Sequence, residues 1–321
     1  ILVDNQDYFE FIPGVPEALF NEKYIPHIRI KHERYLKMTK IILGAVRQIK
    51  RKEIVVKTGK IFKRIRFDYL IIAAGSRYAL PFKAENSLAV FRLKNLVKFA
   101  KRIAKAKTIL VVGGGPTGVE VAGEIVAKTK KKVVLVDSKD RLLYTAPAKA
   151  GNYAQHFLEK KGAVLFLNEK VVDLTGSSGC YLTDKGRKIR ADFVFSCTGI
   201  CSNADSFSFY NKNKINEKNF FIVDDYLRVD KKVFAGGDIV NISEEKTAQH
   251  AQKHAEIICK NIARDVKKKE LIRYTTKYLP VIISLGPYNG IFIYKKLVFC
   301  GMLPRLLKYF IERIIMGEYM L

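Results

Sequence analysis

Short apolar runs alternate with amphipathic stretches along this chain. The run from Ile109 to Val112 is followed by a glycine-rich segment and then by apolar residues at helical spacing from Val119 to Val126. A further apolar run, "KVVLVD", ends in Asp137. Continuous apolar runs of this length are typical of strands buried in a parallel sheet, and their alternation with helices predicts an α/β fold.

The glycine-rich segment "GGGPTG", residues 113–118, lies between the predicted strand and helix and has the spacing of a dinucleotide-binding turn. Gly113 allows the tight turn, Gly115 lets a pyrophosphate approach the backbone, and Gly118 lets the helix pack closely against the strand. The N-terminus of the helix then presents free amides and the positive end of its dipole to the phosphates. A glycine-rich turn without a ligand is the alternative.

Asp137 ends the next strand, where a carboxylate can accept hydrogen bonds from the ribose hydroxyls of an adenosine. A 2′-phosphate in the same place would meet this negative charge, so the sequence favours NADH over NADPH. Lys139 and Arg141 follow closely and keep NADPH as the less favoured alternative.

The same plan occurs twice. The opening residues, "ILVDNQDYFEF", match "VVLVDSKDRLL" in position and character, so that Asp4 corresponds to Asp137. The stretch "DYLIIAAGS", which contains Gly75, matches "DFVFSCTGI", which contains Gly199. Each is a short apolar strand that ends in a turn of small residues, and both glycines are candidate cofactor-binding positions.

Further elements follow the second copy. The run Val233–Ala235 predicts a strand, followed by the turn Gly236–Gly237–Asp238 and by a helix, "EEKTAQHAQKHAEIICKNIARDV". The tail "LPVIISLGPYNGIFIYKKLVFCGML" predicts a strand, a turn and another strand. Between the two copies, the residues from Ala84 to Lys107 predict a linker and an amphipathic helix.

The last stretch, "PRLLKYFIERIIM", has amphipathic helical spacing. Its apolar face is formed by Leu306, Leu307, Phe310, Ile311, Ile314 and Ile315. Its polar face is formed by Arg305, Lys308, Glu312 and Arg313. Three interpretations stay open: a helix that lies on a bilayer with its basic residues toward lipid headgroups, a core or dimer helix, and a helix in a partner's groove.

Charge and cysteine content narrow the choice of partners. The chain has 58 Lys and Arg against 31 Asp and Glu, a net charge of +27, which suggests nucleic acid, an anionic membrane surface or an anionic cofactor, with solvated basic faces as the favoured alternative. No basic motif interleaved with aromatic residues is present, so a specific nucleic-acid partner is not expected.

None of the five cysteines forms a CxxC pair and the first is Cys180, which argues against a disulfide reductase and a sulfide:quinone reductase.

In this order the motifs resemble the two-dinucleotide-binding-domain FAD/NAD(P)H oxidoreductase family, most like type II NADH dehydrogenases and apoptosis-inducing-factor-like ubiquinone reductases. The resemblance rests on "GGGPTGVEVAGEI", the "AAGS" and "CTGI" turns, "VFAGGDIVN" and "TAQHAQKHAE". It implies two Rossmann-like domains of the glutathione-reductase type, with the NADH domain inserted in the FAD domain. The expected FAD domain covers residues 1–85 and 207–270, the NAD(P)H domain 86–206, and a C-terminal membrane-association or dimerisation region 271–321.

The resemblance also implies residue roles for FAD. The Asp of "GGD" holds the flavin ribityl and phosphate region, which carries over to Asp238 beside Gly237. Asp4 would bind the adenosine ribose of FAD, Val46 would lie near the adenine, and Gly75 would cover the pyrophosphate.

By the same resemblance, Glu120, Gln249 and His254 are candidate catalytic groups and Ala248 is a candidate cofactor-binding residue. Glu120 matches a Glu that faces the junction of flavin and nicotinamide, although a carboxylate favoured by the helix dipole is an equal alternative. Ala248 and Gln249 match a helix start beside the flavin ring, while Lys253 departs from the Gln that is usual there. His254 is a candidate proton donor, with an ordinary helix-surface histidine as the alternative.

The implied activity is an FAD-dependent NAD(P)H:quinone oxidoreductase that takes a hydride from NADH and passes two electrons to a quinone. The expected location is the cytoplasmic face of a membrane, as a peripheral protein, with a homodimer as an option. A soluble ferredoxin- or rubredoxin-type reductase and a flavin-free NADH-binding scaffold are the alternatives. About 30 residues with a glycine turn precede the opening strand in an intact unit, so a fragment is expected, with loss of the pyrophosphate clamp as the alternative.

Overall fold

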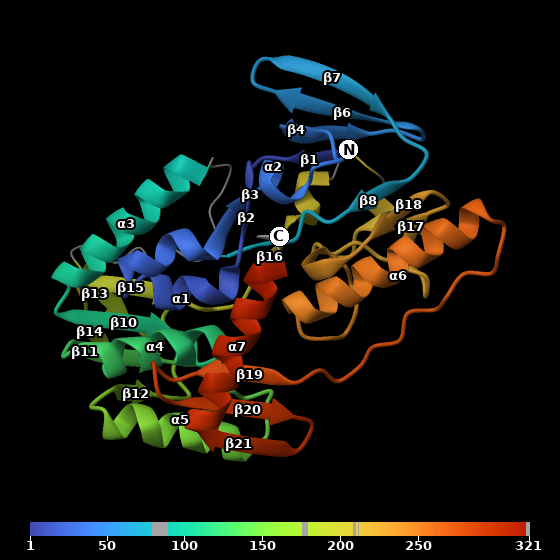
Figure 1. Ribbon diagram of the computed structural model, residues 1–321. Helices are drawn as coiled ribbons and strands as arrows, with labels where there is room; N and C mark the ends of the chain where they lie inside the picture. The colour runs from blue at the N-terminus through green and yellow to red at the C-terminus, as the bar shows by residue number, and fades with distance from the viewer. Residues whose placement is uncertain (79–88, 175–178, 208–209, 211, 319–321) are drawn as a thin grey trace. The chain divides into compact units, whose positions relative to one another are not determined.

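The computed structural model describes residues 1–78, 89–174, 179–207, 210 and 212–318 (Figure 1). The chain forms two compact units. The first unit comprises Ile1–Asn5, Thr39–Tyr78 and Ile200–Leu279, and the second comprises Gln6–Met38, Ala79–Gly199 and Pro280–Leu321. Both units contain parallel strands and helices, which confirms the predicted α/β class. The predicted limits of the cofactor domains stay a prediction.

A four-stranded parallel sheet forms the centre of the second unit. Its strands lie in the order β12 (Val164–Phe166), β11 (Lys132–Val136), β10 (Thr108–Val112) and β15 (Phe193–Ser196). The helices of this unit include α3 (Ala89–Lys105), α4 (Pro116–Lys128) and α5 (Ala148–Lys160) (Figure 1). The predicted strands at "TILVV" and "KVVLV" are therefore neighbours, and part of the predicted linker that begins at Ala84 lies outside the described residues.

The second unit also contains residues from before and after this sheet. Its opening segment contains β2 (Tyr8–Glu10), η1 (Ile12–Gly14), α1 (Val15–Ala18), η2 (Glu22–Ile28), β3 (Arg29–Lys31) and α2 (His32–Tyr35). A hairpin consists of β13 (Cys180–Leu182) and β14 (Lys188–Arg190). The tail forms a three-stranded meander of β19 (Val281–Ser284), β20 (Gly290–Tyr294) and β21 (Leu297–Gly301), where the sequence predicted two strands. The helix α7 (Met302–Glu318) follows.

The first unit is built from small sheets and one long helix. Its parallel pairs are β1 (Leu2–Asp4) with β4 (Ile41–Leu43), and β8 (Leu70–Ile72) with β18 (Val233–Ala235), which also pairs with β17 (Arg228–Asp230). An antiparallel meander consists of β5 (Ala45–Ile49), β6 (Glu53–Thr58) and β7 (Ile61–Arg66). The remaining elements are β9 (Ser76–Arg77), β16 (Cys201–Ser202), η4 (Asn203–Phe207), η5 (Lys212–Lys214), η6 (Gly237–Ile239) and α6 (Ala248–Val266).

Each of the two repeated turns contains a glycine with positive φ. Gly75 follows β8 with a φ of 62°, and Gly199 follows β15 with a φ of 104°. These are conformations that favour glycine, which explains its place in both turns. Beyond the turns, β9 and β16 pair with each other, and the side-chain amide of Asn203 donates to the carbonyl oxygen of Ala74 at 2.7 Å.

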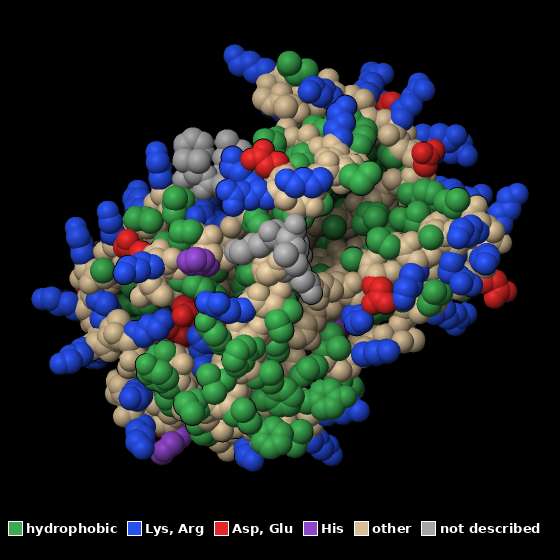
Figure 2. All heavy atoms as spheres, in the orientation of Figure 1, with side chains coloured by type: hydrophobic (Ala, Val, Ile, Leu, Met, Phe, Trp, Pro, Cys, Tyr) green, Lys and Arg blue, Asp and Glu red, His purple; other side chains and the backbone are tan. Residues whose placement is uncertain are grey.

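In α7, several charged side chains are buried while large apolar side chains are exposed. Lys308 and Glu312 are 9% and 5% exposed, whereas Phe310 and Ile314 are 59% and 63% exposed. Arg305 and Lys308 are paired with carboxylates inside the second unit, so these two cations do not face lipid headgroups as predicted, whereas Arg313 is exposed. Figure 2 shows hydrophobic side chains gathered where Figure 1 draws α7 and the β19–β21 meander.

Candidate functional site

The glycine turn joins β10 to α4 in the second unit. A Cβ at Gly113, whose φ is 107°, would lie 2.4 Å from the carbonyl oxygen of Cys197. A Cβ at Gly118 would lie 1.9 Å from the carbonyl oxygen of Gly113, so helix and strand approach at a distance that only glycine permits. The space at Gly115 is open, and α4 begins at Pro116 without a side-chain cap. The turn therefore has room and free amides for a pyrophosphate.

Asp137 lies at the end of β11 beside this turn. Its carboxylate accepts hydrogen bonds from the backbone N–H of Gly114 and, at 2.7 Å, from that of Lys139. These bonds fix the carboxylate at the edge of the turn, where the predicted role in binding an adenosine ribose requires it.

Lys139 and Arg141, the two cations that leave NADPH as an alternative, lie close to the glycine turn. The guanidinium of Arg141 donates to the carbonyl oxygens of Leu143, Tyr144 and Ala146 at 3.4, 2.5 and 3.0 Å. The ammonium of Lys139 lies 5.2 Å from the centre of the Tyr144 ring. Arg141 is therefore engaged within the loop, Lys139 is exposed, and the preference for NADH stays a prediction.

Glu120 lies in the first turns of α4 and forms part of a hydrogen-bonded cluster. Its Oε1 atom accepts from the backbone N–H of Ser284 at 3.0 Å and from the Ser284 hydroxyl at 3.2 Å, and it pairs with the ammonium of Lys308. Burial alone would lower the pKa of Lys308, but Glu120 and Glu312 outweigh it and raise this pKa. Lys308 therefore stays charged at neutral pH.

Further charges surround this pair in the second unit. Arg305 donates to Glu17 on α1 at 2.9 Å, and Lys128 pairs with Glu124 at 2.7 Å on α4. Burial raises the pKa of Glu124, and it raises the pKa of Glu312 to about 7 although Lys308 and Arg305 oppose the shift. Three elements thus contribute carboxylates or cations to one largely buried cluster.

Asp238 lies in the first unit, in the turn that follows β18. The Ser76 hydroxyl donates to its Oδ2 at 2.6 Å, and Gly237 before it has a φ of 78°. Asp4 ends β1, and its carbonyl oxygen accepts from the N–H of Gly44 at 2.8 Å. Val46 lies opposite Val56 in the β5–β6 pair. Together with the turn at Gly75, the two strands and two turns expected to hold FAD are therefore present in the first unit. The roles of their residues stay predictions.

The three candidate groups on α6 differ in their surroundings. Ala248 and Gln249 are exposed at the start of the helix, which Thr247 caps by accepting from the N–H of His250. His254 is only 1% exposed, so it is not a surface histidine. Its Nδ1 accepts from the N–H of Gly237 at 2.9 Å.

Sequence reasoning missed four partners of these residues. Lys308 and Ser284 hold Glu120, while Glu244 and Tyr274 lie beside His254. The carboxylate of Glu244 lies 2.7 Å from the Nε2 of His254. Apart from Glu244, these partners lie far from their targets in the chain, so no local pattern could reveal them.

Membrane spans and metal clusters were also sought in the described part of the chain. There, no helix combines the length and apolar character needed to cross a bilayer. Across the same residues, no group of three or more His, Cys, Asp or Glu side chains is arranged to hold a metal ion.

Comparisons with known proteins agree with this geometry. The family model described as pyridine nucleotide-disulphide oxidoreductase matches residues 6–255. Apoptosis-inducing factor homolog A of Dictyostelium discoideum is 30% identical, over 94% of this chain and 81% of that protein. Ferroptosis suppressor protein 1 of Homo sapiens is 29% identical, over 70% of this chain and 64% of that protein.

Solved structures share the fold at low sequence identity. NDH2 from Plasmodium falciparum, in complex with NADH, superposes with a TM-score of 0.84 at 14% identity, over 99% of this chain and 90% of that chain. The sulfide:quinone oxidoreductase from Aquifex aeolicus gives a TM-score of 0.79 at 16% identity, over 99% and 85%. These likenesses confirm the fold with two dinucleotide-binding domains.

The first prediction concerns the buried carboxyl of Glu312. Its pKa, about 7 in the folded chain against 4.5 ordinarily, means that folding favours its protonated form. This contribution to stability is fully present below about pH 4.5 and is lost as the pH rises through 7. We expect Glu312→Gln to gain roughly 3 kcal/mol of unfolding free energy relative to the wild type between pH 4.5 and pH 8.

Urea denaturation of both proteins across this pH range measures the difference. Glu159→Gln, at an exposed position of α5, is the matched control and should follow the wild type. A constant difference between Glu312→Gln and wild type at all pH values would contradict the assignment.

Proposed function

Because the chain belongs to the pyridine nucleotide-disulphide oxidoreductase family, we propose that it is an FAD-dependent NAD(P)H:quinone oxidoreductase that uses NADH. Membership of this family already makes the chain an NAD(P)H-dependent oxidoreductase with the cofactors FAD and NAD(P)H. The observation that carries the finer proposal is the buried Glu120–Lys308 pair, because a quinone needs protons as well as electrons. Two relatives by fold are named for NADH and for quinone chemistry.

The residues present fit both cofactors. In the second unit, the open space at Gly115 and the amides of α4 would bind the pyrophosphate of NADH, with Asp137 at the ribose. In the first unit, Asp238, held by Ser76, would accept from hydroxyl groups of FAD, and Asp4 would bind the adenosine ribose. When bound, FAD supplies the hydride acceptor and passes electrons on.

The chain's own polar groups account for the acid–base part of the proposal. Lys308 carries a proton that Glu120 and Ser284 hold in place, in a largely buried cluster where water cannot compete. Gln249, exposed at the start of α6, remains the candidate polar contact for a quinone. No CxxC motif occurs in the sequence, so disulfide exchange through such a pair does not enter the proposal.

We predict that the purified chain oxidises NADH with a short-chain quinone and that Glu120→Gln lowers kcat by at least about tenfold. The reason is that the variant leaves the buried Lys308 without its anion, an effect on the order of 1.4 kcal/mol or more in the transition state. Steady-state kinetics with a soluble ubiquinone analogue measure kcat, and nucleotide titration measures NADH affinity, which should change little.

Glu159→Gln serves again as the control, since it lies exposed on α5. Stimulation by ferredoxin or rubredoxin without quinone reduction would select the soluble reductase instead. A protein that binds NADH but shows no flavin absorbance would select the scaffold.

We further propose that the apolar face of α7 attaches the protein peripherally to a membrane, where quinones dissolve. The face is formed by Met302, Leu303, Leu306, Leu307, Tyr309, Phe310 and Ile314, all at least 40% exposed. It continues in Figure 2 onto the β19–β21 meander, where Phe299 is 53% exposed. Contiguous apolar surface of this kind marks a membrane or protein contact.

The double variant Leu303→Ser/Phe310→Ser tests this attachment. Each large side chain contributes about 1.5–3 kcal/mol when it leaves water, so we expect at least a tenfold loss of binding to phosphatidylcholine–phosphatidylserine vesicles in sedimentation. Phe62→Ser, at a 60% exposed position of the first unit, is the control. Unchanged vesicle binding, or a dimer that the double variant disrupts, would favour the homodimer interpretation.

The preference for NADH depends on the charge of Asp137. Asp137→Asn keeps one of the two oxygens that accept from the N–H groups of Gly114 and Lys139, and it removes the repulsion of a 2′-phosphate. We expect the ratio of kcat/KM for NADH over NADPH to fall about tenfold. Asp140→Asn, exposed in the same loop, should leave the ratio unchanged, and an unaltered ratio in Asp137→Asn would contradict the role.

A further inference from the structure

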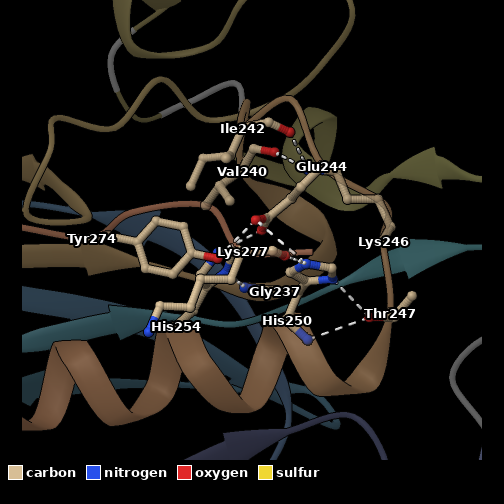
Figure 3. Close-up of polar contacts among 10 residues, drawn as sticks. All are labelled: Gly237, Val240, Ile242, Glu244, Lys246, Thr247, His250, His254, Tyr274 and Lys277. Atoms are coloured by element: carbon tan, nitrogen blue, oxygen red, sulfur yellow. Dashed lines mark hydrogen bonds and ion pairs between the residues drawn. The ribbon is translucent and has the colours of Figure 1, made fainter. Parts of the chain in front are cut away.

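His254 holds the turn that presents Asp238. The N–H of Gly237 donates to the Nδ1 of His254 at 2.9 Å, across 17 residues of chain (Figure 3). A Cβ at Gly236 would lie 3.0 Å from the Cβ of His254, so the turn packs directly on this side chain. Gly237 has a φ of 78°, and the histidine bond fixes this left-handed conformation next to Asp238.

The other ring nitrogen faces a carboxylate. Because Nδ1 accepts a hydrogen bond, the proton of the neutral ring belongs on Nε2, which lies 2.7 Å from Oε1 of Glu244. The Tyr274 hydroxyl donates to Oε2 of Glu244 at 2.7 Å, and its ring packs edge-on against the imidazole with centroids 4.6 Å apart. Glu244 and His254 are both almost completely buried, and the bond from Gly237 fixes this tautomer.

Charged groups from every neighbouring segment act on the ring. Burial lowers the pKa of His254, Glu244 opposes the shift, and Lys246 and His250 add to it. Lys246 donates to the carbonyl oxygens of Val240 and Ile242 at 2.8 and 3.0 Å. His250 contacts the Thr247 hydroxyl at 2.9 Å and the carbonyl oxygen of Lys277 at 3.2 Å. His254 is therefore neutral at neutral pH, as the bond from Gly237 requires.

We propose that His254, oriented by Glu244, is a positioning residue for FAD that holds the Gly237–Asp238 turn, and that acidification releases this turn and weakens FAD binding. Protonation would place an N–H on Nδ1 opposite the N–H of Gly237, and two donors cannot bond. Asp238 would then lose the fixed backbone from which it reaches the cofactor. The inference rests on the proposed function only in assigning Asp238 to FAD.

The test is a titration of the flavin-free full chain with FAD from pH 5 to pH 8, followed by quenching of flavin fluorescence. For the wild type, the dissociation constant should rise roughly three- to tenfold on acidification, the effect of one lost hydrogen bond. In His254→Asn, the amide oxygen replaces Nδ1 as acceptor and does not titrate, so binding should stay near the wild-type value and become independent of pH. In His254→Gln, the amide reaches toward Glu244 and supplies no acceptor to Gly237, so binding should be weak at every pH.

His250→Asn is the matched control, because His250 lies one turn away on α6 and its ring nitrogens contact the Thr247 hydroxyl and the carbonyl oxygen of Lys277, with Oε2 of Glu244 at 3.8 Å. It should retain the acid weakening. Acid weakening that persists in His254→Asn, or equal affinities in the Asn and Gln variants, would overturn the inference. If His254→Gln does not fold, the pH profile of His254→Asn decides alone.

The outcome is separable from that of the proposed function. FAD binding with the expected pH dependence, but without quinone reduction, would overturn the activity and leave the inference standing. Quinone reduction with pH-independent FAD affinity would overturn the inference alone. A wild-type chain that binds no FAD at any pH would overturn both.

Discussion

The ion pair between Glu120 and Lys308 determines how the second unit is organised. It joins α4, the helix that begins at the glycine turn, to α7, which follows almost 190 residues later, and Ser284 adds a third element. Since a buried charge needs its partner, this pair forces one side of α7 toward α4. The apolar residues of α7 must then face outward, and the exposed patch follows from the buried charges rather than from a shortage of core.

Glycine forms the turn after equivalent strands in both halves of the chain. After β8 and after β15, a glycine with positive φ turns the chain out of a parallel sheet, and Gly237 does so once more after β18. The space beside Gly75 and Gly199 is open, and the carboxylate of Asp238 follows Gly237. A family of oxidoreductases with two dinucleotides needs such turns in pairs, and the repeat in the sequence reflects this requirement.

Sequence patterns predicted the strands, helices and turns, which depend on neighbouring residues. They missed the contacts between residues that lie far apart in the chain. The strands at Ile109 and Val133, the helix after Gly118 and the turn at Asp238 all follow from apolar runs and glycine spacing, and the structure contains them. The family was also recognisable, because its motifs are short and contiguous. Amphipathic spacing in α7 gave two faces but not their direction, since burial of Lys308 depends on Glu120 from a remote helix. For the same reason, neither the buried state of His254 nor its contact with Gly237 could be read from "AQKHAE".

The pairing of β9 with β16 brings together the two ends of a long segment of the chain. The segment Ala79–Gly199 leaves the first unit just after one of these strands and re-enters just before the other. Its two points of attachment are therefore neighbours, joined by the bond from Asn203 to Ala74. A replacement of this segment needs two adjacent joints in the first unit, and it must also supply a carboxylate in the place of Glu120, because Lys308 on α7 would otherwise lose its partner.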